Sequence, residues 1–283
     1  MTNSTQKIAE TFQLGGDLTV NRLGYGGMQL TGPGVFGDVK DRENAKRVLQ
    51  EAIAGGVNFI DTAEAYGPQT NEVLIADALY PYPKDFVVAT KGGFSRPGPG
   101  KWVANGDPAF ISENIEGSLK RLKVECIPLW QLHRIDPNIP LEETLAPVVK
   151  AVKEGKIKHV GLSEVTIEQV EQALKILPIV SVQNLYNLGN RKWEDMVDYT
   201  AKKGMAFIPW YPLASGPDSL TDKIADIATK HKATTAQIAL AWLLKRSANI
   251  LLIPGTSSVV HLKENLEAAD IELTDEEFDE LSK

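Results

Sequence analysis

Four side chains that can exchange protons or hold charge stand at, or just after, the ends of apolar runs. Asp61, Lys91 and His133 each end such a run, and Tyr66 follows Asp61 by five residues. An ammonium beside an apolar strand requires a partner, and Asp61 on the neighbouring run can supply one. A salt bridge explains Asp61 and Lys91 but leaves a tyrosine and a histidine at the same place unexplained. Together the four side chains predict a site for acid–base chemistry.

Three of these residues also have an ordinary structural explanation when each is taken alone. Asp61 could cap the turn that follows it, Tyr66 could pack in a loop, and His133 could be a hydrogen-bonded buried side chain. Convergence favours the functional interpretation, because consecutive strands of one barrel bring their carboxyl ends to one rim.

The elements that would position these residues repeat along the chain. Nearly continuous apolar runs are typical of strands buried on both faces of a parallel sheet. The expected strands are Leu23–Tyr25, Val57–Asp61, Phe86–Lys91, Cys126–His133, Ile157–Ser163, Ile179–Asn184, Met205–Tyr211 and Ile250–Pro254. The expected helices are Asp41–Ala54, Asn71–Leu79, Pro108–Leu122, Leu141–Glu154, Ile167–Leu177, Trp193–Lys203, Leu220–Lys230, Thr235–Arg246 and Val259–Ala268. This alternation predicts a closed (β/α)8 TIM barrel, in a single domain of residues 1–283.

An N-terminal segment precedes the repeat. Ile8–Phe12 and Leu18–Asn21 flank Gly15-Gly16-Asp17, a pattern that predicts a β-hairpin. Because the barrel has eight strands without it, this hairpin, within residues 1–22, is expected to plug the N-terminal face.

Two long connections follow the carboxyl ends of strands. Thr31–Lys40 comes after the first strand, and the glycine- and proline-rich stretch Gly92–Pro108 comes after the third and is expected to be an irregular loop. Barrel enzymes build their sites at this face. Phe94 and Trp102 in the second loop favour a substrate lid, although long surface loops are also tolerated without a function.

Negative charge is concentrated at the C-terminus. The chain has 37 acidic and 30 basic residues, and positions 264–283 hold nine of the acids against Lys283 alone. The other 263 residues carry 28 acids and 29 bases, so nothing favours binding to nucleic acid or to an anionic membrane. Residues 270–283 are expected to form a helical tail, with Thr274 as its N-cap and Glu277 completing a capping box.

The sequence also argues against several kinds of site. Cys126 is the single cysteine, which excludes an intrachain disulfide, and the four histidines lack metal-ligand spacing, so no metal is expected. Gly24-Tyr-Gly26-Gly27 lacks the third glycine of a Rossmann fingerprint. With no apolar run long enough to cross a membrane and no hydrophobic stretch behind Met1, a cytoplasmic protein is expected.

Short motifs occur in a fixed order over nearly the whole chain. They are Asp61-Thr-Ala-x-x-Tyr66-Gly67, Asn71-Glu72, Ala89-Thr90-Lys91, Leu132-His133, Gly155-Lys156-Ile157, Gly161-Leu162-Ser163, Gln183-Asn184, Ile253-Pro254-Gly255 and Glu264-Asn265. This ordered set resembles the aldo-keto reductases, and Arg134 and Asp136 make it more similar to their pyridoxal-reductase-like bacterial and fungal branch. The resemblance implies hydride transfer between a nicotinamide and a carbonyl.

Under this resemblance, Asp61, Tyr66, Lys91 and His133 are the catalytic tetrad. A carbonyl that accepts hydride develops alkoxide charge and needs a proton donor at its oxygen. A unit charge some 4 Å away is worth about 4 kcal/mol at an effective dielectric of 20, or roughly three pKa units. We therefore expect Lys91 to lower the pKa of Tyr66 and make it a general acid. Asp61 would hold the ammonium, and His133 would orient the carbonyl.

The resemblance also implies the cofactor contacts. Ser163 and Gln183, beside Asp61, match the pair that binds the carboxamide, although Glu164 stands where many relatives have asparagine. Tyr211 is expected to stack on the nicotinamide, with Trp210 as the competitor. The expected contacts to ribose and pyrophosphate are Gly26, Met28, Leu213, Ser215 and Gly216. The loop 212–219 is short, so the cofactor is expected to exchange readily.

The adenosine end would lie where a helix begins after the eighth strand. The expected contacts are Gly255, Thr256, Ser257, His261, Glu264 and Asn265. Hydroxyls and backbone amides at a helix N-terminus suit a phosphate. The resemblance implies NADPH/NADP+ as the cofactor. Gly255 and His261 stand where many relatives have lysine and arginine, which leaves NADH possible.

The expected partner is a small-molecule carbonyl substrate, bound by a monomer or weak homo-oligomer. Its expected contacts are Phe94, Trp102, Arg134 and Tyr186, although Arg134 could instead pair with Asp136. Two alternatives stay open. One is a lyase barrel with Lys91 as a Schiff-base nucleophile, which Asp61 disfavours by keeping the amine protonated. The other is a cofactor-sensing regulatory subunit of the potassium-channel β-subunit type.

Overall fold

The chain folds around a ring of parallel strands in the computed structural model, which describes residues 10–213 and 218–283. Seven strands share one sheet in the order β11-β10-β9-β8-β5-β4-β3, and all neighbours in it are parallel. Their bounds are β3 (Tyr25–Gly26), β4 (Phe59–Asp61), β5 (Val87–Gly92), β8 (Ile127–Leu132), β9 (Ile157–Ser163), β10 (Ser181–Gln183) and β11 (Ala206–Phe207).

The eighth strand closes the ring through isolated bridges. Ile250 pairs in parallel with Phe207 of β11, and Leu252 pairs in parallel with Leu23, two residues before β3. These pairs join the two edges of the seven-stranded sheet. The prediction of a closed (β/α)8 barrel is confirmed, while its eighth strand is shorter and less regular than the predicted Ile250–Pro254.

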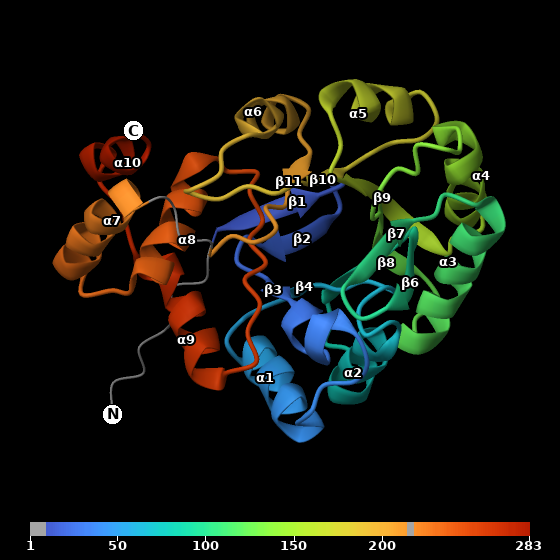
Figure 1. Cartoon of the computed structure of the whole chain (residues 1–283), viewed down its shortest axis with the longest axis horizontal. Coiled ribbons are helices and arrows are strands. Elements are labelled where there is room, and N and C mark those ends of the chain that lie inside the picture. The colour runs from blue at the N-terminus through green and yellow to red at the C-terminus, as the bar shows by residue number, and fades with distance from the viewer. Residues whose placement is uncertain (1–9, 214–217) are drawn as a thin grey trace.

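Helices surround the strands, as Figure 1 shows. Their bounds are α1 (Arg42–Ala54), α2 (Thr70–Leu79), α3 (Pro108–Leu122), α4 (Leu141–Lys153), α5 (Ile167–Leu174), α6 (Glu194–Lys202), α7 (Asp218–His231), α8 (Thr235–Arg246), α9 (Val259–Glu267) and α10 (Asp275–Leu281). Three single 3-10 turns, η1 (Gly27–Gln29), η2 (Pro33–Val35) and η3 (Ala268–Asp270), lie in the connections. The predicted capping box of the tail is confirmed, with Thr274 and Glu277 bonded reciprocally at the start of α10.

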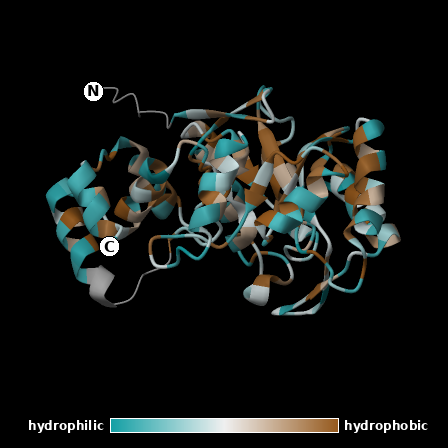
Figure 2. Cartoon of the chain, turned by 90° about the horizontal axis from the view of Figure 1, so that it is seen from above, coloured by the Kyte–Doolittle hydropathy of each residue, from teal (hydrophilic) through white to brown (hydrophobic). Residues whose placement is uncertain are grey.

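Apolar side chains form two layers of core. The larger lies between the strands and the outer helices, and the smaller fills the inside of the barrel with residues such as Phe59 and Leu129. Figure 2 shows hydrophobic residues concentrated on the central strands and many hydrophilic residues on the helices around them. Because the inner layer is filled by side chains, a ligand can reach the barrel only at a rim.

A hairpin of β1 (Thr11–Leu14) and β2 (Leu18–Asn21) closes the N-terminal end of the barrel. Leu14 and Val20 belong to the inner core layer. The prediction that the first strand spans Ile8–Phe12 is wrong, since Phe12–Leu14 continue the alternation of a half-buried strand up to the turn. Ile8 itself lies outside the described residues. That all 283 residues form one domain stays a prediction.

The connection from β5 to α3 is more ordered than expected. The prediction of an irregular loop over Gly92–Pro108 is wrong, because β6 (Phe94–Gly98) and β7 (Lys101–Ala104) form an antiparallel hairpin with a register shift. Glycine and proline mark its turn and its irregularity rather than an absence of strands. We name residues 94–104 the β6–β7 hairpin.

In the part of the chain that the structure describes, no helix has the length and apolar character needed to cross a membrane.

Candidate active site

The central feature at the carboxyl ends of the strands is a buried ion pair with a phenol beside it. Lys91 Nζ donates to Asp61 Oδ1, and both side chains are buried, with 0% and 2% of their surfaces exposed. The same ammonium donates to the Thr62 carbonyl at 2.9 Å and to the Tyr66 hydroxyl at 3.3 Å. Three of the four predicted catalytic residues are therefore in direct contact.

Strand register and one turn produce this contact. Asp61 ends β4 and Lys91 lies near the end of the adjacent β5, whose residue Ala89 pairs with Asp61. After β4 the chain turns over these ends, because Glu64 N donates to the Lys91 carbonyl at 3.0 Å. Tyr66, two residues later, thereby lies above the ammonium.

Burial and charge act in opposite directions on Tyr66. Burial raises its pKa, Lys91 lowers it, and the result is a pKa above the usual 10.0. Lys91 acts on this pKa in the expected direction, but burial outweighs it, because the phenol is buried more deeply than the sequence indicated. Burial alone would lower the pKa of Lys91, but Asp61 and Tyr66 outweigh it, so this pKa lies above 10.5. The pair is thus an ammonium beside a neutral phenol.

His133, directly after β8, faces the phenol. Its ring centroid lies 5.9 Å from that of Tyr66, 4.6 Å from that of Phe94 and 6.0 Å from that of Trp102. Burial lowers its pKa well below 6.5, with further contributions from nearby cations, of which Lys91 contributes most. Its Nδ1 is buried without a hydrogen-bond partner in the described structure. The fourth predicted catalytic residue is therefore a neutral imidazole at the same place.

A cavity of about 470 Å³ opens above these four groups. Fourteen of the residues that sequence analysis proposed line it: Gly26, Met28, Asp61, Tyr66, Phe94, Trp102, His133, Arg134, Ser163, Gln183, Trp210, Tyr211, Leu213 and Gly255. Lys91 lies beneath the floor. One cavity thus brings together the expected acid–base groups, the aromatic side chains of the β6–β7 hairpin and residues from both edges of the sheet.

Comparison with known proteins assigns this arrangement to a family, since the Aldo/keto reductase family model matches residues 22–283. The chain belongs to this family. An uncharacterized oxidoreductase of Schizosaccharomyces pombe is 48% identical to this aldo/keto reductase, over 95% of the chain and 88% of its own length. Pyridoxine 4-dehydrogenase of Escherichia coli is 43% identical, over 95% of this chain and 96% of its own length. The structure of an aldo-keto reductase from Klebsiella pneumoniae in complex with NADPH superposes with a TM-score of 0.81 and 27% sequence identity. The match covers 97% of this chain and 94% of that one.

In this aldo/keto reductase, two side-chain amides donate hydrogen bonds to the second carboxylate oxygen of Asp61. Gln131 Nε2 and Gln183 Nε2 donate to Asp61 Oδ2 at 3.1 and 2.9 Å. Gln183 was expected to bind a carboxamide, and its Oε1 is left for such a contact. Gln131 is a buried side chain that sequence reasoning missed, because it stands inside an apolar strand two residues before the histidine.

The two candidates for the stacking aromatic differ in how firmly they are held. Trp210 Nε1 donates to Glu164 Oε1 at 2.7 Å, and the Leu185 amide donates to the same oxygen. Tyr211 has a positive φ of 58° and is 61% exposed. Glu164, which stands where many relatives have asparagine, thus binds Trp210 and makes the indole the more firmly held of the two rings.

The substrate candidates divide into three that line the cavity and one that does not. Arg134 Nη1 donates to Ser163 Oγ at 3.0 Å, and its guanidinium lies 5.4 Å from the Phe94 ring. The alternative that it pairs with Asp136 is wrong, since that carboxylate accepts hydrogen bonds from backbone amides and Asn138. The prediction for Tyr186 is also wrong. It is fully buried in the core, where its ring packs against Phe207 and Trp242 and its hydroxyl donates to Glu194 of α6.

Residues expected at the adenosine end surround the start of α9. Ser258 caps this helix by accepting from His261 N at 3.4 Å, and Thr256 Oγ1 accepts from Ser258 N at 3.1 Å. Ser257, His261 and Glu264 are not fully buried. Of the contacts expected at this end, only Gly255 lines the 470 Å³ cavity. Asn265 Nδ2 is buried without a partner in the described structure. Ser215 and Gly216 lie outside the described residues.

Three further lining residues were not among the contacts expected from the sequence, although Ile253 belongs to one of the ordered motifs. Gln29, Pro212 and Ile253 also contribute to the cavity wall, from connections whose side-chain directions depend on tertiary contacts. Within residues 10–213 and 218–283, no group of three histidine, cysteine or acidic side chains could hold a metal ion.

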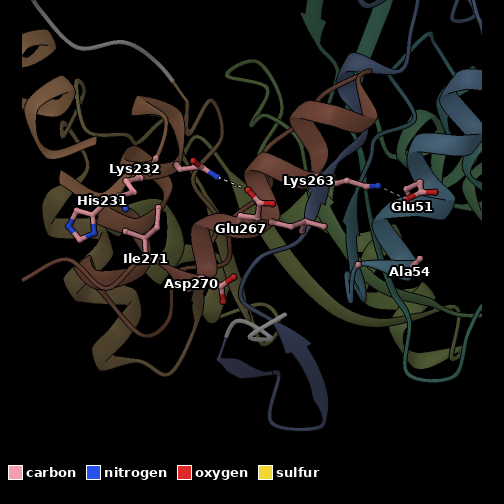
Figure 3. Close-up of a pocket in the computed structure, with 12 residues that line it drawn as sticks. Glu51, Ala54, His231, Lys232, Lys263, Glu267, Asp270 and Ile271 are labelled. Atoms are coloured by element: carbon pink, nitrogen blue, oxygen red, sulfur yellow. Dashed lines mark hydrogen bonds and ion pairs between the residues drawn. The ribbon is translucent and has the colours of Figure 1, made fainter. Parts of the chain in front are cut away.

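A second cavity, of about 580 Å³, lies among the helices and shares no lining residue with the first. Figure 3 shows Lys263 of α9 pointing toward Glu51 of α1, an ion pair of 3.5 Å, and Asp270 and Ile271 below them. The neighbouring His231 pairs with Glu277. Because it holds none of the acid–base groups at the strand ends, we assign it no role in the reaction.

Proposed function

We propose that this aldo/keto reductase reduces aldehydes or ketones to alcohols with NADPH, and that Tyr66 is the proton donor. The single observation that carries the proposal is the Tyr66 hydroxyl, 3.3 Å from a buried ammonium and at the wall of the cavity. A neutral phenol there has a proton to give, and an ammonium beside it stabilises the phenolate left behind. The NADPH complex of the related Klebsiella protein supports the choice of cofactor.

Each protein group has a defined part in this reaction. A bound nicotinamide dinucleotide would supply the hydride. The Tyr66 hydroxyl donates its proton to the substrate oxygen, Lys91 stabilises the phenolate through its 3.3 Å contact, and Asp61 keeps the ammonium in place. His133 stays neutral and binds the carbonyl oxygen by a ring nitrogen, which fixes the angle of approach.

The residues present also fit the cofactor. Gln183 Oε1 and Ser163 would bind the carboxamide, and Trp210, held by Glu164, would stack on the nicotinamide. The amides at the start of α9 would bind the 2′-phosphate, and the unpartnered Asn265 Nδ2 would donate to the adenine. The remaining expected contacts, among them Ser215 and Gly216, stay predictions.

The direct test is consumption of the cofactor at 340 nm with a panel of aldehydes, ketones and pyridoxal, each with NADPH and with NADH. We expect turnover with several carbonyls and a lower KM for NADPH. Arg134 in the cavity predicts that 4-carboxybenzaldehyde binds better than benzaldehyde, and that Arg134→Gln removes the difference. A clear NADH preference would overturn the cofactor assignment. Absence of all turnover would favour the regulatory-subunit alternative.

The pH dependence follows from the raised pKa of Tyr66. Reduction uses the phenol, and burial keeps Tyr66 in that form, so we expect kcat for reduction to stay level up to about pH 9. Oxidation of the alcohol needs the phenolate, so its rate should rise with pH over the whole range. An inflection of reduction near pH 6.5 would instead indicate a titrating imidazole. One near pH 8 would indicate a phenol acidified by Lys91.

The lyase alternative is disfavoured by the same contacts. A Schiff base requires a neutral amine, whereas Asp61 and Tyr66 raise the pKa of Lys91 above its ordinary value although burial opposes them. Borohydride should therefore trap no substrate on the protein. A cytoplasmic location and a monomeric or weakly associated state stay predictions.

A further inference from the structure

Arg96 of the β6–β7 hairpin binds three separate segments of main chain with its three nitrogens. Nε donates to the Lys101 carbonyl at 2.9 Å, across its own hairpin. Nη1 donates to the Ala65 carbonyl at 2.6 Å, one residue before Tyr66, and Nη2 donates to the Gly34 carbonyl at 2.9 Å. One side chain thus joins the hairpin to the connection after β3 and to the turn that carries the proposed acid.

The plane of the same guanidinium lies against an aromatic wall of the cavity. Its central carbon is 3.5 Å from the Trp102 ring centroid. Trp102 in turn is edge-on to Tyr66 at 6.3 Å and close to His133 at 6.0 Å. Because the guanidinium is itself fixed on three carbonyls, it fixes the position of the indole relative to the phenol.

Arg96 is not an ordinary surface ion-pairing residue. Among the described residues it forms no ion pair, and every nitrogen is used on a carbonyl of the backbone. Only a planar group with a fixed fork of donors can bind three carbonyls and stack on an indole together, and lysine, with one ammonium, cannot. A second contact, from Gly100 N to the Gly34 carbonyl at 3.1 Å, joins the same two segments.

We propose that Arg96 is a positioning residue that holds Trp102 as a preformed wall of the substrate cavity. Through this wall it favours carbonyl substrates with a flat aromatic ring over aliphatic ones. The inference rests on the proposed function for its substrate and on the contacts of Arg96 for its mechanism. Because Trp102 is already fixed before the substrate binds, no conformational entropy is lost in ordering it. Affinity therefore increases only for substrates that contact the indole.

The test compares Arg96→Met and Arg96→Lys with the wild type, using benzaldehyde and propanal. We expect both variants to raise KM for benzaldehyde by about 3- to 10-fold and to raise KM for propanal clearly less. The matched control is Arg47→Met, since Arg47 is an exposed arginine of α1 that binds only Asn44 in the described structure. Equal losses for both substrates, or none, would overturn the proposal.

A double variant shows whether Arg96 acts through the indole. If it does, Arg96→Met/Trp102→Leu should have the same KM for benzaldehyde as Trp102→Leu alone, and additive losses would contradict the proposal. Hydrogen–deuterium exchange over residues 94–104 gives a readout without substrate. Arg96→Met should exchange faster there and Arg47→Met should not. If the wild type reduces no carbonyl, the proposed function fails, and unchanged exchange in Arg96→Met separately refutes the positioning role.

Discussion

Replacing Tyr66 by phenylalanine is expected to lower kcat for carbonyl reduction by about 10²–10⁴-fold. The variant removes one oxygen atom and keeps the ring, so the edge-on contacts with Trp102 and His133 are retained. Without the hydroxyl, no side chain described at this point of the cavity can donate a proton as readily, since Lys91 lies beneath the floor and His133 is neutral. The dissociation constant of NADPH, measured by fluorescence quenching, is expected to stay unchanged.

Tyr82→Phe is the matched control for this experiment. The Tyr82 hydroxyl also donates one hydrogen bond, to the Leu122 carbonyl at 2.7 Å, but it lies away from the cavity. Its loss should lower thermal stability slightly and leave kcat unchanged. Full activity in Tyr66→Phe would refute the proposed acid, whereas weakened NADPH binding in that variant would indicate a role in binding instead.

Much of the barrel could be predicted because its signals are local. Buried parallel strands need nearly continuous apolar runs, and helix starts such as Thr274 carry their own capping chemistry. The acid–base groups could be predicted for a similar reason. A polar side chain that ends an apolar strand points to the rim, and neighbouring strands share that rim, so Asp61 and Lys91 had to meet.

The features that could not be predicted from the sequence are those that depend on tertiary contacts. Glycines and prolines after β5 concealed a hairpin whose two strands are joined by a hydrogen bond from Arg96 to the Lys101 carbonyl. Tyr186 was assigned to the cavity because aromatic residues at strand ends are ambiguous until the direction of the side chain is known. The pKa of Tyr66 depends on how fully the phenol is buried, which no spacing of residues reveals.

The second large effect is expected for Lys91→Met. This change leaves the Asp61 carboxylate buried without its cation, so the free energy of unfolding in urea should fall by about 3–5 kcal/mol. It also removes the charge that stabilises the Tyr66 phenolate, so kcat should fall by at least about 10²-fold. Both results are expected together, and a loss of activity alone would not separate catalysis from folding.

The double variant Asp61→Asn/Lys91→Met separates the two roles of the lysine. It removes both charges, and the side-chain carbonyl of the new asparagine would still accept hydrogen bonds from Gln131 and Gln183, so most of the lost stability should return. Activity should not return, because the phenolate still lacks a neighbouring cation. If kcat recovered together with stability, Lys91 would be a structural partner of Asp61 only. If stability recovered while kcat stayed low, the ammonium would act in the reaction itself, in agreement with its contact with the phenol.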